Sequence, residues 1–571
     1  MKKDPRRIFV EDLFYFRPIY MEKIFQAGFF FSTTKIFKNS KGEIKLKILA
    51  ADGISQQGIE ILQSEFEVDV RDKISHEELL EIIPNYDALM VRSASKVSAD
   101  VINRADKLKI IGRAGVGVDN IDINAATSKG ILVINSPGGN TIAATEHTFA
   151  MMLACSRNIP IANETLHRGE WNRKKYVGVE LNGKTLGVIG MGRIGAGVAK
   201  RAITFGMNVL AYDPYINEER ANSLGVKIAS FDELITSSDF ITVHMPLTDE
   251  TRNMISLKQM QQMKNSVRLI NCARGGIINE ADLAAALKDH IIAGAAIDVF
   301  TSEPIPADHP LLGVENIVLT PHLGASTVEA QIGVSVDVAE GIRAALKGEP
   351  VAAINMPSIS QQTMKVIAPY LNLAEKLGHT VYSIAEGAIK NLEVTYNGEI
   401  TKVNTRLLTT AVIKGMLNPV MEKEVNYVNA PGIAKERNIK FAEIKDDAAE
   451  DFSNLITVKV STGSKSFSVQ GTLFGSEGRI VQIDKFRVDV DPHSRILICP
   501  HINRPGVIGN VGTLLGANNI NISGMQVGKT EVESKNLMVL TIDNPIPDDV
   551  LEKFKAIDGI FGAKLVDFSI S

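Results

Sequence analysis

The sequence predicts an α/β protein in which two parallel-sheet units are followed by two smaller mixed units. From about residue 46 to residue 321, short apolar stretches alternate with longer helix-forming stretches, which is the order of strands and crossover helices in a parallel sheet. The stretch TLGVIG runs directly into a glycine-rich turn and opens the second unit. Beyond Pro357, strands joined by glycine-rich turns are expected, as in FSVQGTLFGSEGRIVQID.

The first unit begins with KLKILAADG, which predicts a strand ending at Asp52. Further strands are expected at VDV near Val68, at Asp87–Arg92 and at Lys109–Gly115, with helical stretches such as SHEELLEII between them. A long helix is expected from about Asn140 to Cys155, because ATEHTFAMMLA is rich in good helix formers.

The second unit begins at Lys184 and repeats the same alternation. The strand TLGVIG precedes the helix MGRIGAGVAKRAITFG, and the later strands are NVLAYDP, Ile241–His244, Arg268–Ala273, Gly294–Val299 and Ile317–Pro321. The next helix, VEAQIGVSVDVAEGIRAAL, can cross back to the first unit. We therefore expect a discontinuous substrate domain, residues 46–144 and 322–355, with a nucleotide domain inserted at residues 145–321.

The remaining chain is divided by turn-forming residues at Gly348–Pro350 and Asn355–Pro357. An intervening domain is expected at residues 356–492. The last unit, residues 493–571, reads strand, turn, helix, turn and strand, which is the size of a regulatory module. Residues 1–45 are basic and rich in phenylalanine, and we interpret them as a loose extension, with a targeting segment as the alternative.

The composition is that of a globular protein of about four domains. The chain has 571 residues, 22% charged and 45% hydrophobic. A net charge of −4 and a pI near 6.3 argue against nucleic-acid binding, and no apolar run is long enough for a membrane span. Three widely separated cysteines fit a reducing cytoplasm and argue against a disulfide framework or a metal cluster: Cys155, Cys272 and Cys499.

A dinucleotide-binding turn follows the strand TLGVIG. Gly190, Gly192 and Gly195 form a G-x-G-x-x-G between a strand and a helix, which is the context of a Rossmann-type phosphate site. Asp213, at the end of the next strand, can accept hydrogen bonds from ribose hydroxyls and would repel a 2′-phosphate. The pattern therefore favours NAD over NADP.

Three later strands carry an arginine, an acid and a histidine at their carboxyl ends, where such sheets bind ligands. Arg274 in NCARGG can hold a carboxylate with its planar fork. His322 in PHLGAST can take the proton of a C2 hydroxyl, and Glu303 in DVFTSEP can orient the imidazole. Asp298 is a nearby acid that can contact the nicotinamide amide. The set predicts NAD-linked oxidation of a 2-hydroxy acid.

His147 lies in an apolar helix, and it is expected to be an interior side chain whose hydrogen bonds are satisfied within the protein.

Two further arginines, Arg92 and Arg113, also lie at predicted strand ends. Arginines aimed at one cleft suggest a second anionic group on the substrate, such as a phosphate, and salt bridges within the domain are the alternative. The turn that contains Gly115 and Val116 is expected at the cleft, where it can contact the substrate or serve only as a turn.

Polar residues at the strand–helix turn of the last unit, His501 and Asn503, and Asn521 at its second strand can bind the amino and carboxylate groups of a small amino acid. Ordinary turn chemistry is the alternative.

The motifs together resemble the D-isomer-specific 2-hydroxyacid dehydrogenase family. The glycine-rich turn, NCARGG, DVFTSEP and PHLGAST carry this resemblance, and VRSASKV, GRAGVGVDNID and AATEHT are similar to the members that oxidise 3-phosphoglycerate. The match covers about Leu46 to Pro357. The remainder is similar to the long form of these family members, which adds an intervening domain and a C-terminal ACT domain. The resemblance implies a Rossmann-type domain inserted in a flavodoxin-like substrate domain, an α+β intervening domain related to allosteric substrate-binding domains, and a ferredoxin-like ACT domain.

The same resemblance implies the roles of individual residues. Arg274, Glu303 and His322 would be catalytic, and the substrate would also meet Gly115, Arg92 and Arg113. Contacts with NAD are implied at Val116, Arg193, Ile194, Asp213, Cys272, Ala273, Arg274, Asp298, His322, Leu323, Gly324 and Ala325. Val116 stands where some relatives have threonine, so a backbone contact is implied there. The ACT residues His501, Asn503 and Asn521 would form L-serine half-sites that pair between subunits of a homodimer or homotetramer.

The implied reaction is oxidation of 3-phospho-D-glycerate to 3-phosphohydroxypyruvate in serine biosynthesis. A glyoxylate or hydroxypyruvate reductase of the same family is the nearest alternative, and a NAD-sensing binding protein is a more distant one.

Overall fold

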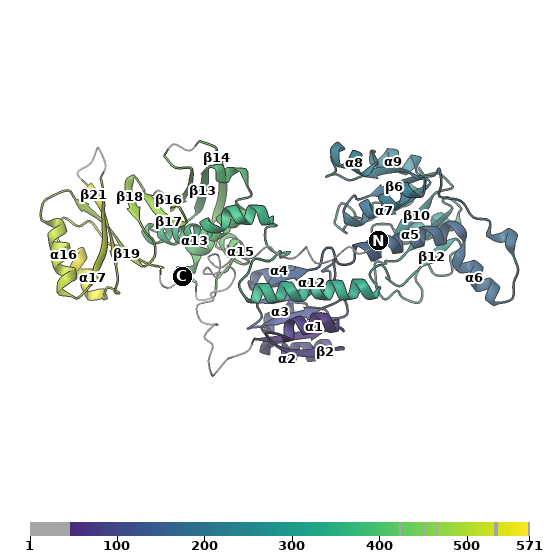
Figure 1. Ribbon diagram of the computed structural model, residues 1–571, viewed down its shortest axis with the longest axis horizontal. Coiled ribbons are helices and arrows are strands. Elements are labelled where there is room, and N and C mark those ends of the chain that lie inside the picture. The colour runs from purple at the N-terminus through teal and green to yellow at the C-terminus, as the bar shows by residue number, and fades with distance from the viewer. Residues whose placement is uncertain (1–45, 422–423, 449–450, 464, 530–534, 569–571) are drawn as a thin grey trace, which may run out of the picture.

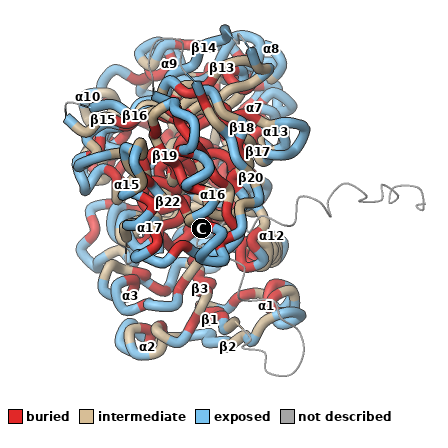
Figure 2. Tube along the Cα trace, turned by 90° about the vertical axis from the view of Figure 1, so that its left-hand side faces the viewer, coloured by how far each residue is buried: buried red, intermediate tan, exposed pale blue. Residues whose placement is uncertain are grey.

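The computed structural model describes residues 46–421, 424–448, 451–463, 465–529 and 535–568. The extension expected at residues 1–45 lies outside the described residues. Within these ranges four β-sheets succeed one another along the chain (Figure 1), and central strands such as β3 (Ala88–Val91) and β19 (Arg495–Ile502) are largely buried whereas the edge strand β2 (Glu67–Arg71) is largely exposed (Figure 2). None of the described helices is long and apolar enough to cross a bilayer.

The first sheet is parallel, with the order β2-β1-β3-β4-β5 of a flavodoxin-like fold. The central strands are apolar at nearly every position because helices cover both faces. The strands are β1 (Lys47–Ala51), β2 (Glu67–Arg71), β3 (Ala88–Val91), β4 (Ile110–Arg113) and β5 (Leu132–Asn135). The helices between them are α1 (Gln56–Gln63), α2 (His76–Ile82), α3 (Ala99–Arg104) and α4 (Ile123–Ser128).

The second sheet has seven parallel strands in the order β12-β11-β10-β9-β6-β7-β8, which is the doubly wound order of a Rossmann-type domain. Its strands are β6 (Thr185–Ile189), β7 (Asn208–Tyr212), β8 (Lys227–Ile228), β9 (Phe240–Val243), β10 (Arg268–Asn271), β11 (Gly294–Ile297) and β12 (Ile317–Leu319). The helices are α5 (Thr141–Arg157), α6 (Ile159–His167), α7 (Arg193–Thr204), α8 (Glu218–Leu224), α9 (Phe231–Ser237), α10 (Leu257–Met260) and α11 (Glu280–Lys288).

The helix α12 (Val328–Leu346) returns the chain to the first sheet after β12. Thr327 caps its start, accepting a hydrogen bond from the amide of Ala330 at 3.1 Å. Val338 and Ile342 are fully buried against β4, and each contributes about 1.5–3 kcal/mol of apolar burial. A Cβ at Gly112 would lie 2.5 Å from Val338, so glycine permits this close approach.

The third sheet has the order β14-β13-β15-β16-β17-β18 and is antiparallel except where β13 meets β14. Its strands are β13 (Asn391–Gly398), β14 (Lys440–Asp446), β15 (Asn454–Ser461), β16 (Ser466–Phe474), β17 (Glu477–Ile483) and β18 (Phe486–Val490). The long helix α13 (Gln361–Ile384) packs on β15, β16 and β17, with α14 (Arg406–Leu417) and α15 (Ala430–Glu436) beside it.

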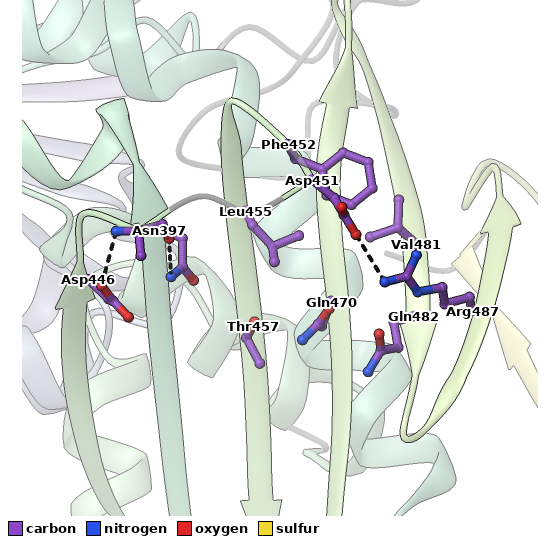
Figure 3. Close-up of a pocket in the computed structure, with 11 residues that line it drawn as sticks. Asn397, Asp446, Asp451, Phe452, Leu455, Thr457, Gln470, Val481, Gln482 and Arg487 are labelled. Atoms are coloured by element: carbon purple, nitrogen blue, oxygen red, sulfur yellow. Dashed lines mark hydrogen bonds and ion pairs between the residues drawn. The ribbon is translucent and has the colours of Figure 1, made fainter. Parts of the chain in front are cut away.

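The face of the third sheet away from α13 holds a cavity of about 340 Å³ (Figure 3). Thr457, Gln470, Gln482 and Arg487 are successive cross-strand neighbours and form a polar row beneath it. Arg487 is already paired with Asp451 at 3.0 Å. The cavity is therefore polar, and its guanidinium charge is locally balanced.

The fourth sheet is antiparallel, with the order β20-β21-β19-β22 of a ferredoxin-like βαββαβ unit. Its strands are β19 (Arg495–Ile502), β20 (Ile522–Gly528), β21 (Lys535–Ile542) and β22 (Lys564–Asp567), and its helices are α16 (Val507–Ala517) and α17 (Asp548–Lys555). The two parallel sheets, the mixed third sheet and this last unit confirm the predicted fold class.

Candidate active site

The glycine-rich turn that connects β6 to α7 is packed tightly against the neighbouring backbone. Gly190 has φ +94°, and a Cβ there would lie 2.6 Å from the carbonyl oxygen of His244. A Cβ on Gly195 would collide with the carbonyl oxygen of Gly190. Gly192 instead faces open space, and no side chain caps α7, which starts at Arg193 and Ile194. The backbone amides at this helix start are therefore placed to receive a pyrophosphate.

Asp213 follows β7 and is fixed beside the glycine-rich turn. One carboxylate oxygen accepts the amide of Met191 at 2.7 Å, and the other accepts the amide of Tyr215 at 2.8 Å. Each carboxylate oxygen has further lone pairs, so ribose hydroxyls can still donate to Asp213. Its charge at this position opposes a 2′-phosphate.

Three strands of the candidate site end two residues earlier than the sequence predicts, because the next residues turn into the site: β10, β11 and β12. Asn271, the last residue of β10, accepts the amide of Ala273 at 3.0 Å and donates to the carbonyl oxygen of Arg274 at 2.8 Å. This buried asparagine shapes the turn that carries Cys272, Ala273 and Arg274. Sequence reasoning did not single it out, although it begins the NCARGG motif.

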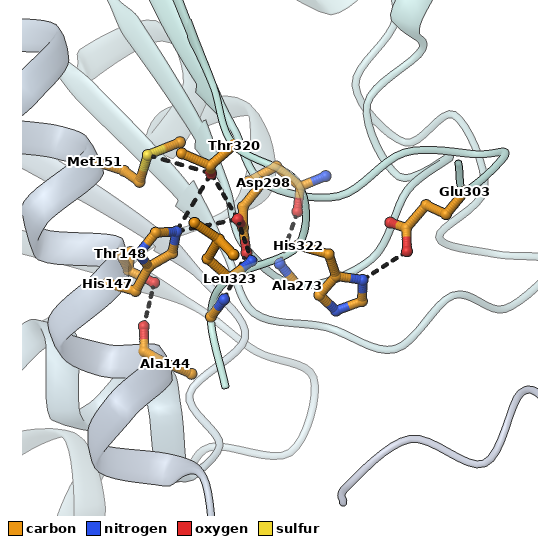
Figure 4. Close-up of polar contacts among 12 residues, drawn as sticks. Ala144, His147, Thr148, Met151, Ala273, Asp298, Glu303, Thr320, His322 and Leu323 are labelled. Carbon is orange, nitrogen blue, oxygen red and sulfur yellow. Dashed lines mark hydrogen bonds and ion pairs between the residues drawn. The ribbon is translucent and has the colours of Figure 1, made fainter. Parts of the chain in front are cut away.

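His322 and Glu303 lie side by side at the carboxyl ends of the strands (Figure 4). Nδ1 of His322 is 2.6 Å from a carboxylate oxygen of Glu303, whose other oxygen accepts the amide of Phe300 at 2.9 Å. The hydrogen bond that His322 donates to Glu303 raises the pKa of His322, although burial opposes this. Burial also opposes ionisation of Glu303, but the hydrogen bond from His322 holds its pKa below the usual value. Nε2 of His322 remains to exchange a proton with a ligand.

Asp298 is fully buried behind the same turn. Its Oδ1 accepts the hydroxyl of Thr320 at 2.6 Å and the amide of Leu323 at 2.7 Å, and its Oδ2 accepts the amide of Gly324 at 2.9 Å. This carboxylate thus anchors the loop of His322, Leu323, Gly324 and Ala325 to the end of β11.

Arg92, Arg113 and Arg274 converge from the two parallel sheets. Arg92 directly follows β3, Arg113 ends β4, and Arg274 follows β10. Burial lowers the pKa of Arg113, and the charges of Arg274 and Arg92 lower it further. Its Nε is buried without a hydrogen-bond partner among the described residues. The carboxylates of Asp119 and Asp52 offset part of the repulsion among these arginines, and an anionic ligand would balance the remaining charge.

Two side chains from loops of the first sheet fix the backbone at Arg92. Asp52 accepts the amide of Arg92 at 3.0 Å, and Asn120 donates to the carbonyl oxygen of Arg92 at 2.8 Å. No local sequence pattern marks Asp52 or Asn120 for this role, because their partners are distant along the chain. A Cβ on Gly115 would collide with the Arg113 guanidinium.

Val116 lies between the two sheets, next to the arginines. Its carbonyl oxygen accepts the side-chain amide of Asn135 at 2.5 Å. The following glycine, Gly117, has no room for a Cβ because the Arg274 guanidinium is there, and Nε of Arg274 lies 3.3 Å from Asp119. The loop after β4 and the loop after β10 are therefore in contact.

The candidate effector residues fall at two ends of the fourth sheet. His501, buried at the end of β19, pairs across the sheet with Asn536, whereas Asn521 precedes β20 at the level of Ile542. Asn503 lies beside His501 in the turn before α16. Along β21, the partner of His501 (Asn536) and the residue beside Asn521 (Ile542) are six residues apart, which is about 20 Å. Asn521 and His501 of one chain are therefore too far apart to share a small ligand. Nδ1 of His501 contacts the carbonyl oxygen of Ile502 at 2.8 Å, and Asn521 donates to Asp543 at 2.5 Å.

Comparisons with known proteins agree with these features. Three family profiles match in order: the D-isomer specific 2-hydroxyacid dehydrogenase NAD-binding domain at 149–324, the D-3-phosphoglycerate dehydrogenase intervening domain at 366–484, and the ACT domain at 496–559. Among solved structures, the TT0316 protein of Thermus thermophilus is 32% identical with a TM-score of 0.51, and covers 54% of this chain and 100% of its own. A glyoxylate reductase from Paecilomyes thermophila is 30% identical with a TM-score of 0.50, and covers 54% and 98%.

Curated relatives match almost the whole described chain. D-3-phosphoglycerate dehydrogenase of Archaeoglobus fulgidus is 47% identical over 526 residues, which are 91% of this chain and 100% of the relative. The enzyme of Bacillus subtilis with the same name is 43% identical over 91% of this chain and 99% of the relative. The chain is thus an NAD-dependent 2-hydroxyacid dehydrogenase, and it belongs to the D-3-phosphoglycerate dehydrogenase family.

Proposed function

We propose that this enzyme oxidises 3-phospho-D-glycerate to 3-phosphohydroxypyruvate with NAD, which is the first step of L-serine biosynthesis. The observation that carries the proposal is the convergence of Arg92, Arg113 and Arg274 beside the His322–Glu303 pair. A substrate with a carboxylate at one end and a phosphate at the other supplies the negative charge that this cleft needs.

The substrate would be held at both ends. Arg274 and the backbone of the loop at Gly115 would bind the carboxylate, while Arg92 and Arg113 would bind the phosphate. Arg274 comes from the second sheet and the other two from the first. Substrate binding would therefore draw the two parallel-sheet units together and help to exclude water from the reacting carbon.

NAD, when bound, supplies the acceptor for the hydride that leaves C2. Gly190, Gly192 and Gly195, with Arg193 and Ile194, would hold its pyrophosphate, and Asp213 its adenosine ribose. The nicotinamide end would lie against the remaining predicted contacts, at Val116, Cys272, Ala273, Asp298, Leu323, Gly324 and Ala325. The open space above Gly192 and the uncapped start of α7 fit this group.

His322 would act as the general base. Its Nε2 would take the proton of the C2 hydroxyl, while Nδ1 stays hydrogen-bonded to Glu303. Glu303 would stabilise the imidazolium that forms, and Arg274 would polarise the C2 oxygen. These three residues would be catalytic because each touches the substrate or the group that exchanges its proton.

The direct test is NADH formation from 3-phosphoglycerate and NAD, followed by near-ultraviolet absorbance. We expect turnover in the wild type, and a much larger loss of turnover than of NAD affinity on His322→Ala. In Arg92→Ala, the KM for 3-phosphoglycerate should rise strongly. An unchanged KM, together with rapid NADH oxidation by glyoxylate or hydroxypyruvate, would instead favour the related reductase activity.

We also propose that L-serine regulates the enzyme through the ACT domain. His501 and Asn503 lie about 20 Å along the sheet from Asn521, so a site that uses all three needs a second chain. A homodimer or homotetramer would supply it. The test is the same assay with added L-serine, combined with light scattering to determine the number of subunits.

A further inference from the structure

The helix α5 contributes His147, which lies in the AATEHT stretch but has no assigned role, to the cofactor end of the site. Nε2 of His147 lies 3.1 Å from Oδ1 of Asp298 (Figure 4). The expected interior histidine is thus hydrogen-bonded, and its partner is the carboxylate that anchors the His322 loop. An ionised carboxylate only accepts hydrogen bonds, so Nε2 of His147 carries the hydrogen.

The charge on Asp298 depends on this contact. Burial opposes ionisation of Asp298, but the hydrogen bonds from His147 and Thr320 outweigh it and hold the pKa of Asp298 below its usual value. Four donors meet the two oxygens: an imidazole, a hydroxyl and the amides of Leu323 and Gly324. Removal of one donor leaves a buried carboxylate short of partners, which weakens the whole network.

The network reaches the catalytic base through the backbone. His322 has φ +55°, a left-handed conformation that a residue with a Cβ adopts at a cost in energy. The two residues after it give their amide hydrogens to Asp298. The position of the His322 imidazole therefore depends on Asp298, and the ionisation of the Asp298 carboxylate depends on His147.

A cation site is the other use for this cluster. Ligand atoms of His147, Cys272 and Asp298 lie within 4.8 Å of one another. However, burial and the charge of Asp298 raise the pKa of the Cys272 thiol to about 12, and Asp298 already has four donors. Metal binding needs a thiolate and free carboxylate lone pairs, so the cluster favours a hydrogen-bonded carboxylate.

We propose that His147 is a positioning residue for the reaction: it fixes Asp298, and through Asp298 it fixes the turn that presents His322. The inference rests on the proposed roles of Asp298 and His322. It predicts that His147 controls the rate of turnover far more than the affinity for the adenosine half of NAD.

The test compares three variants with the wild type in the full-length enzyme. His147→Leu removes the donor and keeps the bulk, whereas His147→Gln keeps an N–H at a similar reach. Thr145→Val is the matched control, because Thr145 is buried on α5 and bonds only to the carbonyl oxygen of Thr141 among the described residues. We expect the Leu variant to lose about ten- to a hundredfold in kcat. The Gln variant should recover to within about threefold of wild type if one donor suffices.

Affinity for ADP-ribose, measured by calorimetry, should change less than about threefold in every variant if only the nicotinamide end is disturbed. Equal kcat in the Leu and Gln variants, or an equal loss in Thr145→Val, would overturn the inference. If the Leu variant does not fold, His147→Asn replaces it, because its shorter amide does not reach Asp298. Turnover of 3-phosphoglycerate by the wild type tests the proposed function. The ratios of kcat between the variants and the wild type test the role of His147.

Discussion

Replacement of Glu303 by glutamine tests the electrostatic interaction between the Glu303 carboxylate and the His322 imidazole. The Glu303 carboxylate lies 2.6 Å from Nδ1 of His322 and raises the pKa of that imidazole. Glutamine keeps the shape and can still accept a hydrogen bond, but it removes the negative charge. The variant therefore isolates the electrostatic part of the contact.

The magnitude follows from the exposure of the pair. A hydrogen bond between charged groups contributes about 1.5–3 kcal/mol, but the side chains of His322 and Glu303 are 48% and 36% exposed, so solvent screens the interaction. We take about 1.4 kcal/mol, which is about a tenfold change in rate.

The sign of the pH effect is fixed by the direction of the reaction. Oxidation needs a neutral imidazole, so kcat/KM rises as pH rises through the pKa of His322. Without the carboxylate this pKa falls, and the acid limb of the profile should move to lower pH. The plateau rate should fall about tenfold, because the imidazolium formed in the reaction loses its partner.

The assay is the pH dependence of NADH formation in wild type and Glu303→Gln, with Glu315→Gln as a control at an exposed acid before β12. The control should leave the acid limb in place. A limb that stays still or moves to higher pH in Glu303→Gln, despite a lower rate, would refute the assignment of that limb to the His322–Glu303 pair.

Four further predictions concern the cofactor, substrate and effector sites. Arg274→Lys should lower kcat/KM about a hundredfold, because an ammonium lacks the planar fork; steady-state kinetics would show a milder loss if the fork is not used. Asp213→Ala should raise the ratio of NADP to NAD efficiency at least about tenfold, and an unchanged ratio would contradict its ribose role. Gly195→Val should abolish NAD binding in calorimetry, because its Cβ collides with the Gly190 carbonyl oxygen. Asn503→Ala should remove the response of the rate to L-serine, and retained inhibition would place the effector elsewhere.

Local sequence signals predicted the turn after β6 and the polar residues that follow the strands of the second sheet. The glycines of the turn after β6 are dictated by close backbone contacts that any side chain would break, so their spacing alone reports the turn. Likewise, β10, β11 and β12 are short apolar runs followed at once by polar residues. Their order in the sheet places those residues at one edge. The small differences at strand ends arise because Asn271, Asp298 and Thr320 use their side chains to bend the chain.

The amino-acid sequence by itself thus determined the α/β class and the NAD cofactor, and it predicted the arginine, acid and histidine of the candidate site, because period, turn chemistry and spacing are local properties. Only the tertiary structure decided which groups that are distant in the sequence lie close enough to interact. It brought Arg113 to Arg274, Asp52 to Arg92, and His147 to Asp298, and it separated His501 from Asn521. Hydrogen bonds and charge repulsion act over a few ångströms in space, and the sequence separation of two residues does not reveal that distance.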